Sequence, residues 1–288
     1  MTMTLGRSSE SPQIRVKDGM NALRIHGGRI DLAAGRYPDA PRPWLDLSTG
    51  INPCAWPTER VSTVDLHSLP SPAAIAELEA AAAAVFGTTA DRVVALPGSE
   101  LGLRSLAALD LPSPVRFVVP SYATHAEAID DAAPIARGAI DTVADGTLLL
   151  ANPNNPDGRH DMPQSLLRIA RNGAFLVVDE AFTDILPGTS LIPLLGPDDR
   201  AIVFRSFGKF FGLPGVRLGF IIAPPDHVVA MRRRLGSWPV SAHAVAYGIA
   251  AYQDAEWIAA ARVSIVERAA RLDAMLSGHG LKARGECA

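Results

Sequence analysis

The stretch Ala201-Ile202-Val203-Phe204-Arg205-Ser206-Phe207-Gly208-Lys209 joins a short apolar run to a turn that carries a hydroxyl and an amine. Other short apolar runs recur along the chain, namely Val93 to Leu96, Val115 to Val119, Thr147 to Ala151, Ala174 to Val178 and Leu218 to Ala223. Runs that are apolar on both faces are typical of strands buried between two helix layers. Helical patterns and turn residues separate the runs. The sequence therefore predicts an α/β fold with an open, mostly parallel sheet between helix layers.

Polar motifs follow three of these runs directly. Asn152-Pro153-Asn154-Asn155-Pro156-Asp157-Gly158 comes after one run, Asp179 ends the next, and Ser206 to Lys209 follows a third. Ligands of open α/β sheets bind beyond the carboxyl ends of the strands. We therefore expect these three motifs to meet at one edge of the sheet.

The side chains of the three motifs match the requirements of pyridoxal 5'-phosphate. Lys209 offers the primary amine that binds the cofactor aldehyde. Asp179 can pair with the pyridine nitrogen and keep it protonated, which makes the ring an electron sink. Asn155 can donate a hydrogen bond to the ring oxygen. Taken singly, each residue has a plain alternative: a solvated lysine, an aspartate that caps a turn, and an ordinary turn asparagine.

Other residues are candidates for the phosphate and the ring face. Ser206 and Arg217 supply the hydroxyl and the guanidinium that an oxyanion binds. Gly98, Ser99 and Glu100 lie between a predicted strand and a predicted helix, where backbone amides can meet the same phosphate. Tyr122 follows the next strand and can stack on the ring, although simple packing explains a tyrosine there equally well.

The bulk composition excludes several classes of protein. The 288 residues are 48% hydrophobic, and 27 basic and 30 acidic residues give a formal net charge of -3 without long single-sign blocks. This pattern argues against a nucleic-acid partner and against an anionic membrane surface. No apolar run reaches membrane-spanning length. The two cysteines, Cys54 and Cys287, favour a reducing compartment and hence the cytoplasm.

Two other kinds of site do not fit the spacing. The seven histidines are scattered without a ligand pair, so we expect no metal site. Gly208-Lys209 is not a nucleotide phosphate loop, because Phe210 stands where that loop needs Ser or Thr.

The chain is predicted to have three parts. Residues 1–70, rich in Gly and Pro, should form an N-terminal arm and part of a small domain. Residues 71–238 should form the large cofactor-binding domain, beginning with a helix from Pro72 to Phe86 that Ser71 caps. Residues 239–288 should form part of the small domain, with helical patterns from Ala242 to Tyr252 and from Trp257 to Leu276.

These motifs resemble the fold-type-I pyridoxal phosphate enzymes, in the branch that contains histidinol-phosphate aminotransferase and threonine-phosphate decarboxylase. The resemblance covers nearly the whole chain and is closest to the decarboxylase of cobalamin biosynthesis. It rests on His26-Gly27-Gly28, the stretch from Pro43 to Pro53, Asp179-Glu180-Ala181-Phe182, and Arg205 to Gly212. Aminotransferases of the branch usually have Tyr at the position of Phe182, and losing that phenol favours the decarboxylase modestly.

The resemblance implies a homodimeric enzyme that converts L-threonine O-3-phosphate to (R)-1-amino-2-propanol O-2-phosphate. His26 and Asn52 are then candidates for substrate contact, with a structural loop role as the alternative. Members of the branch run further at the C-terminus, so the resemblance also implies an incomplete second domain. Two alternatives stay open: an aminotransferase of the histidinol-phosphate type, and a non-catalytic protein that binds the cofactor.

Overall fold

The computed structural model describes residues 27–281. The chain divides into two compact units, Met1–Gly50 and Ile51–Ala288. The described part of the smaller unit contains the helix α2 (Ile30–Arg36), and Gly28 donates its N–H to Ser48 Oγ at 2.8 Å. The remaining elements belong to the larger unit. The predicted domain boundaries at residues 70 and 238 stay a prediction.

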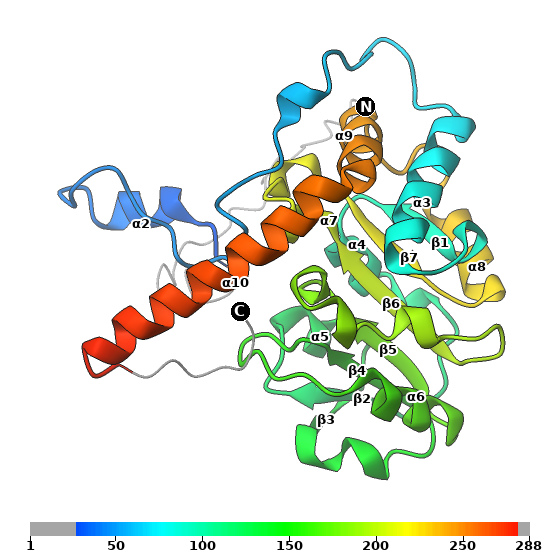
Figure 1. Cartoon of the computed structure of the whole chain (residues 1–288). Helices are drawn as coiled ribbons and strands as arrows, with labels where there is room; N and C mark the ends of the chain where they lie inside the picture. The colour runs from blue at the N-terminus through cyan, green and yellow to red at the C-terminus, as the bar shows by residue number, and fades with distance from the viewer. Residues whose placement is uncertain (1–26, 282–288) are drawn as a thin grey trace, which may run out of the picture. The chain divides into compact units, whose positions relative to one another are not determined.

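A seven-stranded sheet lies at the centre of residues 51–281, in the order β1-β7-β6-β5-β4-β2-β3 (Figure 1). Its strands are β1 (Val93–Leu96), β2 (Val115–Val119), β3 (Ala133–Ala136), β4 (Thr147–Ala151), β5 (Phe175–Asp179), β6 (Ala201–Ser206) and β7 (Gly219–Ile222). β7 runs antiparallel to both of its neighbours, and the other pairings are parallel. The predicted α/β class with a mostly parallel sheet is therefore confirmed.

The structure differs from the sequence prediction at four strands. β5 is shifted by one residue and includes Asp179, and β6 extends to Ser206. β7 is one residue shorter at each end than the predicted run. β3 was not predicted, because the sequence Ala-Pro-Ile-Ala has no buried apolar run. Pro134 lacks the N–H that an inner strand needs, but β3 is an edge strand and tolerates it.

Helices precede, connect and follow the strands along the chain. They are α3 (Pro72–Phe86), α4 (Ser99–Arg104), α5 (Ala123–Glu127), α6 (Pro163–Arg171), α7 (Phe207–Phe210), α8 (Pro225–Leu235), α9 (Ala242–Gln253) and α10 (Ala255–Gly278). α3 has the predicted bounds. The Ser71 side chain accepts a hydrogen bond from the Ala74 N–H at 3.1 Å, and Gly87 ends the helix with a left-handed φ of 74°.

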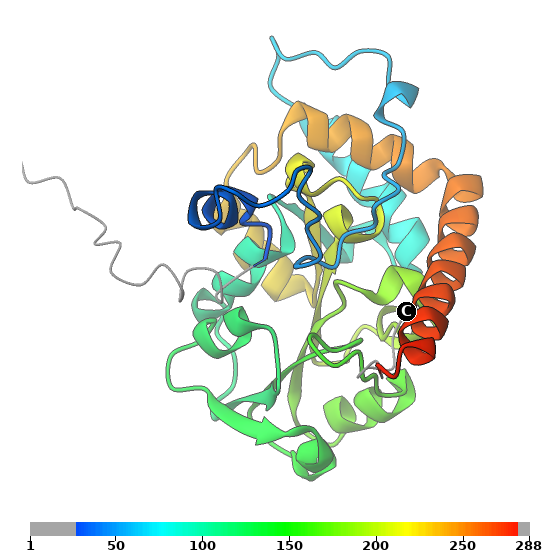
Figure 2. The same ribbon diagram turned by 90° about the vertical axis from the view of Figure 1, so that its left-hand side faces the viewer.

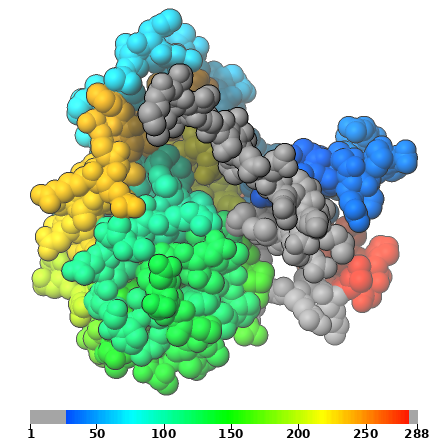
Figure 3. All heavy atoms as spheres, turned by 180° about the vertical axis from the view of Figure 1, so that it is seen from behind, coloured from blue at the N-terminus to red at the C-terminus, as the bar shows by residue number. Residues whose placement is uncertain are grey.

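The two faces of the sheet are covered by different helices. Alternate strand residues such as Val178 and Val203 pack with α3, α6 and α9 in one core cluster. Their sequence neighbours, such as Val177 and Phe204, pack with α4 and α8 in a second cluster. Figure 3 shows α8 and the segment from α4 to β3 on the side that faces away in Figure 1. Because successive strand residues point to opposite faces, each strand contributes to both clusters.

α9 and α10 follow one another and run in different directions from their junction at Asp254 (Figures 1 and 2). Asp254 caps α10 by accepting the Trp257 N–H at 3.2 Å, and it also accepts the Trp56 indole N–H at 2.9 Å. These hydrogen bonds connect the segment around Trp56, near the start of the larger unit, to the C-terminal helices. Between residues 27 and 281, no helix combines the length and the hydropathy that a membrane span requires.

Candidate functional site

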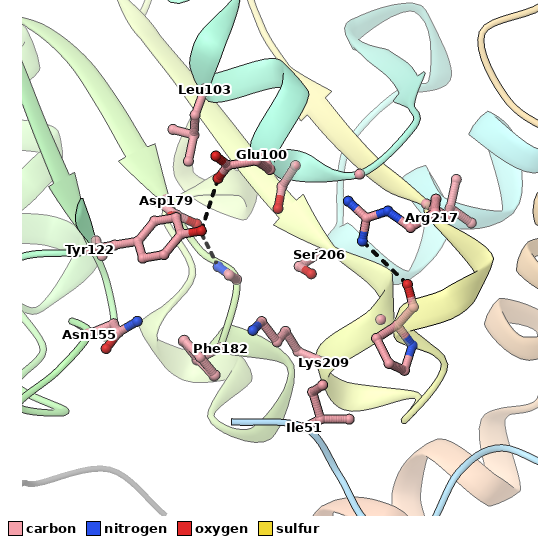
Figure 4. A pocket seen from close by; sticks show the side chains of 17 residues that line it. Ile51, Glu100, Leu103, Tyr122, Asn155, Asp179, Phe182, Ser206, Lys209 and Arg217 are labelled. Atoms are coloured by element: carbon pink, nitrogen blue, oxygen red, sulfur yellow. Dashed lines mark hydrogen bonds between the residues drawn. The ribbon is translucent and has the colours of Figure 1, made fainter. Parts of the chain in front are cut away.

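A cavity of about 240 Å³ lies at the carboxyl ends of β4, β5 and β6. The residues around it come from separate parts of the chain and include the following predicted site residues: Gly98, Ser99, Glu100, Tyr122, Asn155, Asp179, Ser206, Lys209 and Arg217. Figure 4 shows the Lys209 amine pointing into the cavity, with Tyr122 and Asp179 on one side and Arg217 on the other. The expected meeting of the three strand-end motifs is therefore what the topology produces.

Lys209 lies in the single-turn helix α7, directly after β6. Burial lowers the pKa of its amine; the nearby Asp179 carboxylate opposes this shift and the Arg217 guanidinium adds to it. The Nζ atom lies 5.5 Å from the centre of the Phe182 ring. A lowered pKa increases the fraction of neutral amine near pH 7, and only the neutral amine is a nucleophile.

Asp179 ends β5 and is almost fully buried, with 6% of its surface exposed. One carboxylate oxygen accepts the Ala181 N–H at 3.1 Å, and the other lies 3.2 Å from His125 Nε2. His125 belongs to α5 and is fully buried. A ring N–H on Nε2 would fix the carboxylate in place and stabilise its charge.

His125 was not predicted as a site residue from the sequence. The spacing of the histidines does not identify a histidine whose partner is 54 residues away. One local signal exists: His125 lies three residues after Tyr122, so both can face the same side of a helical turn. Their rings meet edge to face, with centroids 6.0 Å apart.

The Glu100 side chain has hydrogen-bond partners that were not predicted from the sequence. Its carboxylate accepts hydrogen bonds from the Tyr122 hydroxyl at 3.0 Å and from Thr124 Oγ1 at 2.9 Å. Arg104 Nε donates to it at 2.7 Å. The side chain therefore orients Tyr122 at the cavity wall. Only the backbone N–H of Glu100 is suited to an anionic phosphate, because a second carboxylate would repel it.

Asn155 sits in the loop between β4 and α6, and its two asparagine neighbours hold that loop. The Asn152 amide donates to the Asp161 carbonyl at 3.1 Å, and its oxygen accepts the Asp161 N–H at 2.8 Å. Asn154 Nδ2 donates to the Pro120 carbonyl at 3.0 Å. The motif thus combines two buried anchors with one partly exposed asparagine that lines the cavity.

The opposite wall of the cavity is suited to an anion. Ser206 ends β6, and Arg217 follows the short turn η8 (Pro214–Val216). Arg217 has a φ of 56°, in the left-handed region that residues other than glycine seldom adopt. A Cβ atom built on Gly98 would lie only 2.6 Å from Arg217 Nη2. Glycine at position 98 therefore lets the guanidinium lie against the loop after β1.

Of the two predicted substrate residues, Asn52 is not among the cavity residues, and His26 lies outside the described residues. Asn52 lines a second, smaller cavity, and its side-chain amide donates to the Phe210 carbonyl and accepts the Cys54 N–H, both at 3.0 Å. Its backbone N–H also donates to the Lys209 carbonyl at 3.0 Å. In this arrangement Asn52 supports α7 from outside the cavity.

The charges around the cavity leave two cations for a ligand. Between residues 27 and 281, neither Lys209 nor Arg217 has a carboxylate within 4.0 Å. In the same part of the chain, no group of three or more His, Cys, Asp or Glu side chains is placed to hold a metal ion. The arrangement can accept an anion beside Arg217 and a carbonyl carbon beside Lys209.

Comparisons with known proteins place this chain among its relatives. The model of the family "Aminotransferase class I and II" matches residues 29–288. The threonine-phosphate decarboxylase of Sinorhizobium sp is 39% identical over 280 residues, covering 92% of this chain and 82% of that protein. The threonine-phosphate decarboxylase of Pseudomonas aeruginosa is 36% identical over 88% of this chain and 78% of that protein.

A solved structure shows the same fold. The histidinol-phosphate aminotransferase of Sinorhizobium meliloti, in complex with pyridoxal-5'-phosphate, superposes with a TM-score of 0.64. The match covers 78% of this chain and 65% of that chain at 22% identity.

Proposed function

This chain belongs to the aminotransferase class I and II family, and from that premise we propose that it decarboxylates L-threonine O-3-phosphate. The product is (R)-1-amino-2-propanol O-2-phosphate, and the cofactor is pyridoxal 5'-phosphate. The proposed substrate rests on the similarity to two threonine-phosphate decarboxylases, at 39% and 36% identity over most of both chains. We further propose that the product enters cobalamin biosynthesis, and that the enzyme is a cytoplasmic homodimer.

The cavity residues fit this cofactor in their chemistry. Lys209 is a partly buried amine with a lowered pKa, suited to the cofactor aldehyde. Asp179 is a buried carboxylate suited to the pyridine nitrogen, and Asn155 can donate to the ring oxygen. Ser206 and Arg217 line the anion-accepting wall and would hold the phosphate.

When bound, pyridoxal 5'-phosphate supplies an aldehyde for the substrate amine and a ring that withdraws electrons from the substrate Cα. Asp179 would hold a proton at the ring nitrogen, which increases that withdrawal. His125 keeps the Asp179 carboxylate oriented, with 3.2 Å between Nε2 and the carboxylate oxygen. Tyr122 would cover the ring face, with its hydroxyl fixed on Glu100 at 3.0 Å.

Lys209 has two tasks in this proposal. Its neutral amine would hold the cofactor aldehyde and would be released when the substrate amine takes its place. The cofactor would accept the electron pair left when the bond from Cα to the carboxylate breaks and carbon dioxide leaves. Lys209, in its ammonium form, would then be placed to donate a proton to Cα, which yields the amine product.

Phe182 supports decarboxylation over transamination. Its ring lies beside the Lys209 amine, 5.5 Å from Nζ to the ring centre, and offers no hydroxyl to the cavity. A tyrosine there would add a donor to the cofactor oxygen.

The test is direct. Purified protein loaded with pyridoxal 5'-phosphate is incubated with L-threonine O-3-phosphate, and aminopropanol phosphate is measured by mass spectrometry alongside released carbon dioxide. We expect equal amounts of both products. A reaction that instead needs a keto acid and leaves the pyridoxamine form would identify an aminotransferase. Bound cofactor without turnover of either kind would identify a non-catalytic cofactor-binding protein.

A further inference from the structure

Arg205 and Glu180 lie next in sequence to two cavity residues but face the other side of the sheet. Asp179 and Ser206 belong to the α4 face, as do Val177 and Phe204 before them. The period of two along a strand therefore turns Glu180 and Arg205 to the α3 face. Both are buried, with 0% and 4% of their surface exposed.

Arg205 connects three segments on that face. Nη1 lies 3.4 Å from Glu180 Oε2, and Nη2 donates to the Asp184 carboxylate. Asp184 belongs to the turn η5 (Thr183–Ile185), which directly follows Phe182. The guanidinium carbon also lies 4.4 Å from the centre of the Phe86 ring. One side chain thus bridges the end of β6, the end of β5 and the turn after it.

Each of these three segments carries residues of the cavity. The end of β6 carries Ser206 and leads into Lys209, the end of β5 carries Asp179, and the turn carries Phe182. The two carboxylates that Arg205 contacts, Glu180 and Asp184, are therefore at most two residues from a cavity residue. Residues that are neighbours in the chain move together. A change in any of these contacts therefore also moves a side chain that lines the cavity.

The buried charges of the cluster make its contacts sensitive to substitution. Glu180 and Asp184 share the Arg205 guanidinium, and Glu180 also accepts the Ser190 hydroxyl at 2.7 Å and the Leu191 N–H at 2.6 Å. Arg262 from α10 donates to the Asp184 carbonyl at 2.8 Å. Weakening the guanidinium contact leaves the buried Asp184 carboxylate without its charge partner, which is strongly unfavourable unless the segments move.

We propose that Arg205 is a positioning residue for the cofactor site, holding the ends of β5 and β6 and the η5 turn at the spacing that the cofactor requires. This inference rests on the proposed function, because it takes the cavity to be the pyridoxal 5'-phosphate site.

The test compares R205K with R171K. Lysine keeps the positive charge but lacks the planar fork, so it cannot reach Glu180 and Asp184 together. Arg171 is the matched control, since its guanidinium holds Asp199 with two bonds of 2.9 and 3.0 Å at the opposite ends of the same strands. Both variants replace an arginine that pairs with a buried carboxylate.

Cofactor affinity of the apo-protein, and the absorbance of the bound cofactor across pH, are measured for both variants and the parent. We expect R205K to bind pyridoxal 5'-phosphate about 10- to 100-fold more weakly and to shift the midpoint of the absorbance titration, because a misplacement of about 1 Å has effects of that size. R171K should keep the parent affinity and midpoint. Circular dichroism and thermal unfolding report folding separately.

Equal affinity and equal titration midpoints in R205K and R171K would overturn the proposal. If R205K does not fold, D184N takes its place, since it removes one charge of the cluster and keeps the side-chain shape. We then expect a smaller loss of affinity in the same direction, and parental behaviour of D184N would overturn the proposal. Failure of the proposed function gives a different result: the parent protein binds the cofactor normally but forms no aminopropanol phosphate.

Discussion

Asp179 and Glu180 are adjacent carboxylates, yet one faces a cavity and the other a core. On the cavity side, Lys209 and Arg217 have no carboxylate within 4.0 Å in the described part of the chain. On the core side, the single guanidinium of Arg205 contacts two carboxylates. Charged side chains that pair with one another within the chain hold the fold together. The side chains on the cavity side are arranged for a group that the chain itself does not supply.

This comparison has an energetic consequence. A partly buried amine without a counter-ion, such as that of Lys209, costs stability, and it is retained where chemistry needs it. A buried charge cluster loses several kcal/mol when one partner is removed. Substitutions on the cavity side should therefore lower activity and leave stability nearly unchanged, whereas substitutions on the core side should lower stability.

The largest effect is expected for K209A. Loss of the amine that holds the cofactor and returns the proton should lower kcat about 10²- to 10⁴-fold. The apo-protein should be at least as stable as the parent in urea, because a partly buried amine is removed. The chain has three lysines, Lys17, Lys209 and Lys282, so borohydride reduction and peptide mapping can assign the labelled one. Label on another lysine, or a clear loss of stability, would break the comparison.

D179N should have the next largest effect. The amide keeps the size of the side chain but cannot hold a proton at the ring nitrogen, so we expect kcat to fall about 10²- to 10³-fold. The control is D199N, at the other end of the strands, where the carboxylate accepts two bonds from Arg171. D199N should lower stability and leave kcat unchanged. Similar kcat values for the two variants would contradict the assignment of Asp179.

R217M should weaken cofactor binding with little effect on the fold. Loss of a charged donor to the phosphate corresponds to about 10- to 100-fold in affinity. The matched control is R116M, which removes an arginine paired with Asp145 at 2.9 Å far from the cavity lining. Titration of apo-protein with pyridoxal 5'-phosphate gives both constants. Equal affinities in R217M and R116M would exclude Arg217 as a phosphate ligand.

The smallest effect concerns E180Q and pH. Burial raises the pKa of Glu180 to about 7 from 4.5, although the Arg205 guanidinium and two hydrogen bonds act against it and Asp184 adds to it. Between these pH values the folded protein keeps a proton that the unfolded chain has lost. Stability from this group is therefore full below pH 4.5 and is lost as the pH rises to about 7.

E180Q should flatten that decline, because glutamine does not titrate. Urea unfolding of the apo-protein across about pH 5 to 8 measures how the free energy of unfolding changes with pH. The free energy of unfolding of E180Q relative to that of the parent should be highest at the alkaline end of this range. Among the described residues, Arg205, Asp184, Arg262 and the buried Tyr252 remain the charged or titratable groups facing the cluster. An unchanged slope in E180Q would show that Glu180 is ionised throughout this range.

Much of the fold could be predicted because its signals are local. The helix α3 depends on Ser71, Pro72 and Gly87, which act within a few residues, and its bounds agree with the prediction. Six of the seven strands in the sheet correspond to apolar runs. β3 gave no such signal, because its four residues lie at an edge and only one of their side chains is even partly buried.

The candidate site could be predicted in composition but not in its internal contacts. The strand-end positions of Asn155, Asp179 and Lys209 follow from the order of runs and motifs. The hydrogen bond by which Glu100 orients Tyr122, 22 residues away, depends on how α4 packs against α5. The hydrogen bond from the Asn52 amide to the Phe210 carbonyl joins residues that are 158 positions apart in the sequence.

The sequence by itself determined the fold class, the family and the residue types at the strand ends, because apolar period, turn chemistry and motif order are properties of neighbouring residues. Only the tertiary structure decided which charges are shared and which are left for a ligand. His125 beside Asp179, and Arg205 between Glu180 and Asp184, are set by how separate strands and helices pack. The free energy of a buried charge depends on its nearest partner in space, and sequence order does not give that distance.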